Sequence, residues 1–292
     1  MATTPEPSSR ENTYFIKDSG AELARLVEQE RFFQKALGGL LPEHPDLPAF
    51  LAPLHRVLDV ASGSGGWVLE LARQYPHLEV TGFDIDARMI AYANTQAQVA
   101  GLDNASFRVM NAVEPLDFPD NYFDLVNARY LAAIPIEAWP RVMQELFRIT
   151  RSGGIIRLTE NEQYSLTNGP AFEKLSGMFI QALKRAGNIA SPDGRTTGLT
   201  PMLARFLRNA GCQNIQRRPF VIDWSSGMEA HEAIFQDLRV AIKLLQPFLI
   251  KMGVTTPEEA DHLYREAEIE MMSDDFCALW YFLTVWGETS KP

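Results

Sequence analysis

The sequence predicts an α/β fold in which helices cover both faces of a mainly parallel sheet. Short apolar runs suited to buried strands recur through the first 160 residues, at 57–60, 79–86, 106–110, 123–129 and 155–160. Helical patterns lie between several of them, and the alternation of strand and helix is typical of a parallel sheet. With 292 residues, 46% of them hydrophobic, the chain is long enough to bury a substantial core.

The first expected strand leads directly into a glycine turn. Val57, Leu58 and Val60 read as a strand buried on both faces, and a helix is expected to begin near Trp67. Between them Gly63 and Gly65 allow the backbone to approach a ligand closely. A glycine loop that feeds a helix N-terminus presents unpaired N–H groups, so this turn predicts a site for an anionic or polar ligand.

The residues of the turn favour one nucleotide-like ligand over another. A dinucleotide site requires G-x-G-x-x-G, but Val68 stands where the third glycine would be. Asp59, at the strand end, would place a carboxylate where a pyrophosphate would lie. S-adenosylmethionine has no phosphate, and its cationic portion can face Asp59 while the loop N–H groups face its carboxylate. The turn therefore favours S-adenosylmethionine.

The second strand, 79–86, supplies an acid for the nucleoside. Asp84 lies 25 positions after Asp59, where an acid can accept both ribose hydroxyls of an adenosine. Asp86 is expected instead to cap the helix 87–100, which ends at Gly101. Ile85 and Met89 are expected to pack on the adenine.

The next elements complete the predicted sheet. The third strand, 106–110, leads to three residues whose amide and backbone groups could hold the adenine edge: Asn111, Ala112 and Val113. The fourth strand is 123–129. A helix over 137–150 then leads through Gly153 and Gly154 to the fifth strand, 155–160.

Four ordered motifs within residues 55–160 now carry a family resemblance: VLDVASGSGGW, VTGFDID, PLDFPDNYFDLVNAR and ELFRITRSGGIIRLTE. Together they resemble the class I S-adenosylmethionine-dependent methyltransferases, in particular the bacterial small-molecule group related to ubiquinone and menaquinone methyltransferases. The resemblance implies a Rossmann-like sheet of seven strands, the last of them antiparallel, with an inserted helical lid. It also implies S-adenosylmethionine as the methyl donor and S-adenosylhomocysteine as the product.

The resemblance assigns roles to residues at matching positions. The methionine moiety would lie at Asp59, Ser62, Gly63 and Gly65, and Ala61 would be a further cofactor-binding residue. Asp84 would bind the ribose, Asn111 and Ala112 the adenine edge, and Asn127 would open the region where donor meets acceptor. Two departures are Ala61, where the family often has glycine, and Asn111, where an aspartate is common. Ala61 is an acceptable replacement if its φ is negative.

The remaining chain predicts a lid and an acceptor pocket. We expect a disordered tail over 1–12, an N-terminal helical lid over 13–40, a donor-binding core over 41–163, and the rest of the sheet with inserted helices over 164–292. Ser19 and Glu22 form a capping-box pattern for a helix that ends at Gly38. Tyr14 could close over the sulfonium, because an aromatic face attracts a cation. The later elements are expected at 170–186, 200–211, 214–223, 229–251, 257–272 and 276–286, where 214–223 and 276–286 are strands.

Composition excludes several classes of function. The net charge of −10 would repel a nucleic acid. No apolar run reaches the ~18 residues of a membrane span, and the N-terminus has no signal-peptide pattern, so we expect a cytoplasmic protein. Cys212 and Cys277 are expected to be buried thiols, and the five histidines show no metal-ligand spacing, so no metal is expected. A homodimer is left open.

The acceptor side is less defined. Candidates for a base or an acceptor contact follow the fourth and fifth strands or open an inserted helix: Glu160, Tyr164, Arg129 with its neighbour Tyr130, and His231. Each has a structural alternative: Glu160 could simply end its strand, Arg129 could pair with an acid, and His231 could be a cap. The sequence does not identify the acceptor.

The sequence therefore predicts a methyltransferase that acts at O, N or C of a small, apolar or aromatic metabolite by in-line displacement in a lidded pocket. Two alternatives stay open at this point. One is a protein that binds S-adenosylmethionine without methyl transfer or uses it for other chemistry. The other is a nicotinamide-dependent oxidoreductase, which the missing third glycine and Asp59 disfavour.

Overall fold

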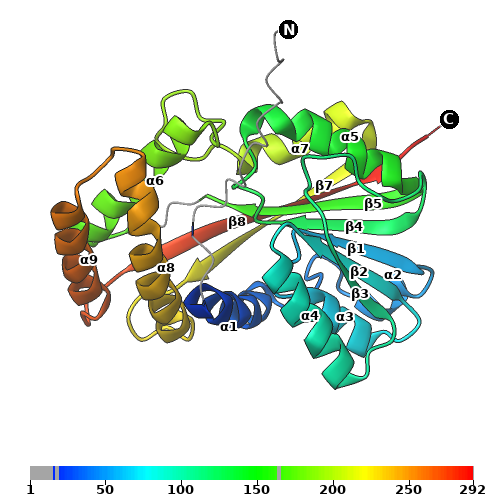
Figure 1. The fold of residues 1–292 in the computed structure, drawn as a ribbon, viewed down its shortest axis with the longest axis horizontal. Coiled ribbons are helices and arrows are strands. Elements are labelled where there is room, and N and C mark those ends of the chain that lie inside the picture. Colours follow the sequence, from blue (N-terminus) through cyan, green and yellow to red (C-terminus); the bar gives the residue numbers. More distant parts are fainter. Residues whose placement is uncertain (1–15, 17–19, 163–165, 292) are drawn as a thin grey trace, which may run out of the picture.

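A mixed sheet runs through the molecule, and helices cover both of its faces (Figure 1). The computed structural model describes residues 16, 20–162 and 166–291. Within that part of the chain the sheet has eight strands in the order β3-β2-β1-β4-β5-β8-β6, and β7 pairs with β8. The expected tail over 1–12, Tyr14 and Tyr164 lie outside the described residues.

The first five strands are parallel, as the sequence predicts. They are β1 (Arg56–Val60), β2 (Glu79–Asp84), β3 (Ala105–Val109), β4 (Phe123–Arg129) and β5 (Thr150–Asn161). Val57, Leu58 and Val60 are fully buried, because β1 lies between β2 and β4 and has helices on both sides. Their side chains divide between the two hydrophobic clusters that flank the sheet.

One face of the sheet carries α3 (Gly66–Gln74) and α4 (Ala87–Ala100), and the other carries α5 (Trp139–Ile149) and α7 (Leu203–Ala210) (Figure 1). Short helices, α2 (Leu47–Leu51), η1 (Ile136–Ala138) and η2 (Thr200–Met202), lie in the connections. Asp86 caps α4 as expected, since its side chain accepts a hydrogen bond from the N–H of Arg88, and Gly101 ends the helix with φ +63°. The predicted helix over 137–150 is divided into η1 and α5, and Pro140 occupies the first turn of α5.

The last strand is antiparallel, as expected. β8 (Ala278–Thr289) runs between β5 and β7 (Cys212–Asp223), antiparallel to both. A two-residue strand that the sequence did not indicate, β6 (Leu166–Thr167), pairs with the start of β8. The expectation for the cysteines is half right: Cys212 is buried, but Cys277 is exposed because it lies in the turn before β8.

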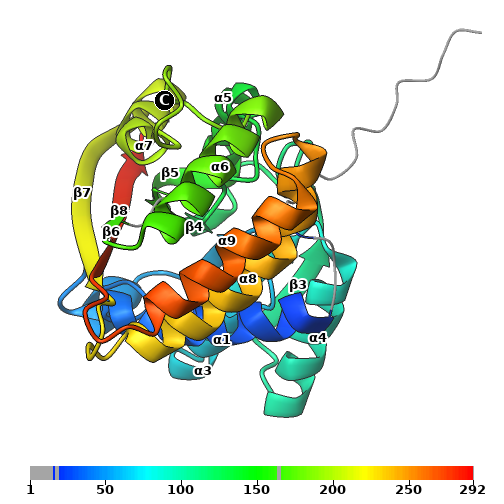
Figure 2. The same ribbon diagram turned by 90° about the vertical axis from the view of Figure 1, so that its left-hand side faces the viewer.

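A layer of helices lies beside the carboxyl ends of the parallel strands. It consists of α1 (Gly20–Leu37), α6 (Pro170–Ala186), α8 (His231–Lys251) and α9 (Pro257–Met271). Figure 2 shows α1, α8 and α9 running next to one another, and α6 packs against α9. A third hydrophobic cluster joins this layer to β8 through residues such as Phe33, Phe172 and Trp280. Among the described residues, no helix combines the length and the apolar character that a membrane span requires.

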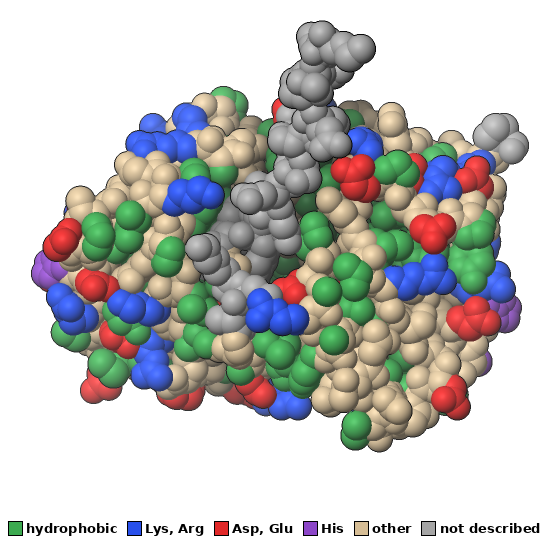
Figure 3. Space-filling model, viewed as in Figure 1, with side chains coloured by type: hydrophobic (Ala, Val, Ile, Leu, Met, Phe, Trp, Pro, Cys, Tyr) green, Lys and Arg blue, Asp and Glu red, His purple; other side chains and the backbone are tan. Residues whose placement is uncertain are grey.

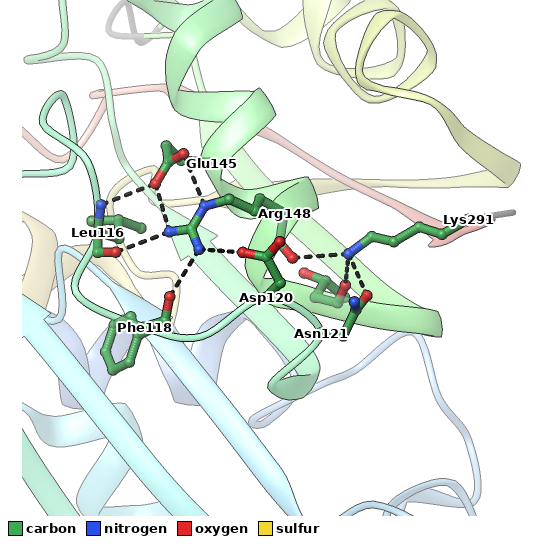
Figure 4. Close-up of polar contacts among 8 residues, drawn as sticks. Leu116, Phe118, Asp120, Asn121, Glu145, Arg148 and Lys291 are labelled. Carbon is green, nitrogen blue, oxygen red and sulfur yellow. Dashed lines mark hydrogen bonds and ion pairs between the residues drawn. The ribbon is translucent and has the colours of Figure 1, made fainter.

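Polar contacts stabilise the end of the sheet that lies opposite this layer of helices. Arg148, near the end of α5, donates to the backbone oxygens of Leu116 and Phe118 and pairs with Asp120 and Glu145 (Figure 4). Lys291 donates to Asn121 and to the backbone oxygens of Arg148 and Thr150. These contacts fix the loop before β4 and the end of the chain against the sheet.

Candidate functional site

A cavity of about 1210 Å³ opens where the parallel strands end and the helical layer begins. Its walls come from the loops after β1, β2, β3 and β4 and from α1, α6 and α8. This is the position at which α/β sheets hold their ligands, in the crevice outside the carboxyl ends of the strands.

The glycine turn after β1 forms one wall. Ala61, Ser62, Gly63 and Ser64 line the cavity. The N–H of Ser62 donates to the Phe83 oxygen at 2.8 Å, and the N–H of Gly65 donates to the Ser62 oxygen at 2.9 Å, so the turn is tight. The hydroxyl oxygen of Ser62 is buried and has no hydrogen-bond partner among the described residues.

Ala61 does not meet the condition that the sequence analysis set for it. Its φ is +54°, in the left-handed region where a side chain is strained by about 1–2 kcal/mol. Gly63 has φ +52°, and a Cβ there would meet no atom within 4 Å. The backbone at Gly63 is therefore open to a ligand.

Gly65, which the resemblance placed at the methionine moiety, packs against neighbouring elements of the core. It does not line the cavity, and a Cβ at this position would lie 2.6 Å from the Phe107 ring and 2.8 Å from the Ala93 Cβ. The close packing of α3 against the neighbouring strand and helix leaves no room for a side chain at this position. The φ of Gly65, +80°, also favours glycine.

Asp84 faces the cavity from the end of β2. One carboxylate oxygen accepts from the N–H of Gly63 and the other from the N–H of Asp86, both at 2.9 Å. Burial raises the pKa of Asp84, and hydrogen bonds from the backbone of Asp86, Gly63 and Ile85 oppose that change. Each oxygen keeps a further lone pair, so the carboxylate that shapes the turn can also accept two hydroxyl groups of a ligand.

The predicted adenine contacts all line the same part of the cavity, near Asp84: Ile85, Met89, Asn111, Ala112 and Val113. The side-chain oxygen of Asn111 accepts from the N–H of Val113 at 3.2 Å, which holds the segment after β3 in a turn. The structure thus brings together five residues that come from the loops after β2 and β3 and from the first turn of α4.

Asp59 and Asn127 are buried beneath the cavity and do not line it. Asn127 donates to Asp59 at 2.7 Å and accepts from Arg157 at 2.8 Å. Burial raises the pKa of Asp59 to about 6, although Arg129, 3.6 Å away, lowers it. Asp59 and Asn127 therefore contribute to the site through the hydrogen-bond network that they form. In this geometry neither side chain has the direct access to the donor that the sequence analysis expected.

Two acids that the sequence analysis missed complete this network. Glu30 of α1 accepts from both terminal nitrogens of Arg129, at 3.0 and 3.1 Å. Glu43 forms a buried ion pair with Arg157. Glu43 and Arg157 are 114 positions apart, so no local pattern could reveal the pair.

The other half of the cavity is mainly apolar. Its lining comes from α1, α6, α8 and β8: Phe33, Phe172, Leu175, Leu238, Ile242 and Trp280. A polar cluster interrupts this surface, where Asp237 of α8 accepts from Arg25 at 2.7 Å and from Gln29 at 3.0 Å. The cavity therefore joins a polar half near β1 and β2 to an apolar half beneath the helical layer.

The acceptor-side candidates separate in the structure. Arg129 lines the cavity. Glu160 is buried just behind the lining, where one oxygen accepts from the N–H of Leu131 and the other has no partner among the described residues. Burial raises the pKa of Glu160 to about 8. His231 lies outside the cavity lining, with Nδ1 2.9 Å from the Trp224 oxygen and its ring stacked on Phe235, so we leave it out of the proposed site.

The strand order, the glycine turn after β1 and the acid at the end of β2 are features of an α/β fold that binds a nucleoside at the carboxyl ends of its strands. Comparisons with known proteins identify the class. Residues 57–154 match the family model described as a methyltransferase domain.

Two curated relatives are demethylmenaquinone methyltransferases. The relative from Bacillus cytotoxicus is 28% identical over 182 residues, which is 58% of this chain and 74% of the relative. The relative from Geobacillus kaustophilus is 34% identical over 113 residues, and the match spans 38% of this chain and about half of the relative (47%). A solved structure of a methyltransferase-like protein from Bacillus halodurans superposes with a TM-score of 0.51 at 16% identity, over 93% of this chain and 100% of that chain, and shows the same fold.

The family-model match and these relatives support a class I S-adenosylmethionine-dependent small-molecule methyltransferase. The methyl donor of this class is S-adenosylmethionine. The residues present fit it: Asp84 would hold the ribose, and the open backbone at Gly63 leaves room for the methionine moiety. The nicotinamide alternative receives no support from these relatives.

Proposed function

We propose that the protein transfers the methyl group of S-adenosylmethionine to an O, N or C atom of a small, neutral and mainly apolar metabolite. The observation that carries this proposal is the cavity itself, since it joins the turn after β1 to an apolar pocket under α6 and α8. The relatives named for demethylmenaquinone support it, because a quinone is a largely apolar acceptor.

The charges around the cavity favour a neutral acceptor. Three arginines line the cavity in the part of the chain that the structure describes, and each is paired with an acid: Arg25 with Asp237, Arg129 with Glu30, and Arg141 with Glu114. Six acids line the same cavity. A carboxylated or phosphorylated acceptor would therefore enter an electronegative site in which every lining arginine already has a partner.

When bound, S-adenosylmethionine supplies a methyl group on a sulfonium, which a nucleophile of the acceptor attacks in line. The chain contributes alignment and the exclusion of water. Asp84 and the Gly63 backbone would hold the nucleoside and the methionine moiety, whereas the apolar residues of α6 and α8 would exclude water from the acceptor. Arg129 stays a proposed acceptor contact, and Glu160 a proposed base.

We further propose that the chain divides into three functional segments, residues 13–40, 41–163 and 164–292. α1 belongs to the first segment and acts as a lid. α1 reaches across the cavity: Glu30 pairs with Arg129 at the end of β4, and Gln29 donates to Asp237 of α8. Phe33 anchors the C-terminal part of α1 against Trp280 and Phe282, whereas these polar contacts can break and reform as a ligand enters. Amide exchange in α1 should then slow when S-adenosylhomocysteine is added.

Nucleic acid is an unfavourable acceptor. The chain carries a net charge of −10, and on the face shown in Figure 3 basic and acidic side chains are interspersed. A phosphate backbone would find no extended basic area on that face. A second copy of the chain in a homodimer remains compatible with the proposal.

The proposal is tested in two steps. Titration calorimetry should show binding of S-adenosylhomocysteine and no binding of NADH. Methyl transfer from labelled S-adenosylmethionine is then measured over phenols, quinols and amines, each beside its carboxylated or phosphorylated counterpart. We expect the neutral, apolar members to be methylated. Donor binding with no methyl transfer to any class would favour the binding-protein alternative, and preferential methylation of the anionic members would refute the charge argument.

A further inference from the structure

Tyr130, the residue that follows β4, has an unusual backbone conformation. Its φ is +59°, in the left-handed region that bulky side chains rarely adopt. The N–H of Tyr130 donates to the Thr159 oxygen at 3.0 Å, which keeps the backbone in place. The ring packs beside Phe33 of α1, with centroids 5.5 Å apart, and it lines the cavity. Strain of this kind concentrates at functional sites.

The hydroxyl of Tyr130 is buried and has no hydrogen-bond partner among the described residues. The side-chain oxygen of Asn161, at the end of β5, is also buried and has no hydrogen-bond partner among the described residues, and Asn161 is only 3% exposed. Both residues line the cavity. Buried polar atoms in folded proteins nearly always have partners, so two unpartnered atoms on one cavity wall indicate a partner that comes from a ligand.

Both residues lie next to Phe282 of β8. Asn161 is paired with Phe282 of β8, and the ring of Tyr130 lies 6.3 Å from the ring of Phe282. Their hydrogen-bonding capacities are complementary. The oxygen of Asn161 only accepts, whereas the hydroxyl of Tyr130 can donate, because burial raises its pKa well above the usual range and keeps it protonated.

We propose that Tyr130 and Asn161 form the subsite that binds a hydroxyl group of the methyl acceptor. A ligand hydroxyl would donate its proton to a hydrogen bond with the Asn161 oxygen and accept one from the Tyr130 hydroxyl. A second lone pair of the ligand oxygen stays available. The apolar surface of α6 and α8 would hold the rest of the molecule, so the substrate class is an apolar alcohol or phenol. This inference rests on the proposed function and specifies its acceptor.

The test uses a pair of probes that differ in one group. Binding of 2-naphthol and of 2-methylnaphthalene to the full chain saturated with S-adenosylhomocysteine is measured by titration calorimetry. We expect 2-naphthol to bind about tenfold more tightly or better, since two hydrogen bonds distinguish the probes. Equal affinities, or no binding of 2-naphthol, would overturn the proposal without any variant.

Two variants assign the preference to these residues. Y130F and N161L should each reduce the preference for 2-naphthol by about fivefold and leave the affinity for S-adenosylhomocysteine within twofold. Because the Tyr130 hydroxyl has no described partner, Y130F should keep or raise the thermal midpoint of unfolding. A preference that survives both variants would overturn the proposal.

The matched control is Y264F on α9, which removes a hydroxyl that donates to Glu268 at 2.9 Å outside the cavity lining. It should leave the preference unchanged, and an equal loss in Y264F and Y130F would show an indirect effect. Failure of the proposed function itself would appear separately, as an absence of S-adenosylhomocysteine binding or of methyl transfer.

Discussion

Replacement of Asp84 by Asn should weaken donor binding in a way that depends on the ribose hydroxyls. The carboxylate of Asp84 already accepts two backbone N–H groups at 2.9 Å, and its remaining lone pairs face the cavity. An amide has the same shape, but it has lost the charge and turns a donor toward one of its partners. The two charge-assisted bonds to the ribose are therefore weakened together.

The size of the effect follows from these contacts. Two hydrogen bonds to a charged group contribute roughly 2–3 kcal/mol together, which corresponds to a loss of affinity of about 30- to 150-fold. Asp84 also holds the turn after β1, so D84N should lower the unfolding free energy by about 1–3 kcal/mol. Thermal unfolding must therefore accompany each binding measurement.

A double-mutant cycle separates the ribose contact from the effect on the turn. Adenosine and 2′,3′-dideoxyadenosine are titrated into the wild-type protein and D84N, and the control D46N alters an N-cap aspartate of α2 outside the cavity lining. The wild type and D46N should prefer adenosine, and D84N should not. If D84N keeps the full preference in a folded protein, Asp84 does not bind the ribose.

Four further predictions follow from the same geometry. Burial raises the pKa of Glu160 from 4.5 to about 8, so the folded state keeps a proton that the unfolded chain loses. The unfolding free energy of the wild type should therefore fall relative to that of E160Q as the pH rises from 5 to 8. A difference that stays constant over this range would contradict the raised pKa. A61G should raise the unfolding free energy by about 0.5–1 kcal/mol, because glycine removes the strain of a side chain at positive φ. The control A91G, on the exposed surface of α4, should lower it by about 1 kcal/mol. Equal effects of the two substitutions would exclude strain at Ala61. G63V should reduce the affinity for S-adenosylhomocysteine more than tenfold, because the side chain enters the open space at φ +52°; normal affinity would show that the turn does not hold the donor. R157M should destabilise the protein by about 3–5 kcal/mol in chemical denaturation, because it leaves Glu43 buried without its partner, and R157M/E43M should recover much of the loss if the pair acts as a unit.

The sequence was sufficient where an element carries its own signals. α4 begins after Asp86 and ends at Gly101 as expected, because a side-chain cap and a left-handed glycine are local features. The parallel strands were recognisable from continuous apolar runs. β6 was not, because two residues that pair only with β8 show no periodicity.

The grouping of the proposed donor-side residues was predictable for a related reason. Asp84 and the residues proposed to contact the adenine follow strands closely in the sequence, and the carboxyl ends of parallel strands meet at one end of the sheet. Asp59 also lies near the end of a strand, but it bonds to Asn127 of the neighbouring strand and lies beneath the cavity.

The acceptor side depends on contacts between distant segments. Asp237 and Arg25 are 212 positions apart, and they meet only because α1 packs against α8. The position of Tyr130 depends on a positive φ, which its residue type disfavours and which only the surrounding structure can impose. Neither feature has a signal in the sequence.

A crystal structure of the protein with S-adenosylhomocysteine tests the central claim most directly. The account predicts that the ribose hydroxyls lie within hydrogen-bond distance of the Asp84 carboxylate, that the adenine lies among Ile85, Met89 and Asn111, and that the sulfur points toward Tyr130 and the apolar half of the cavity. A product bound elsewhere, or one whose sulfur points away from that half, would contradict it.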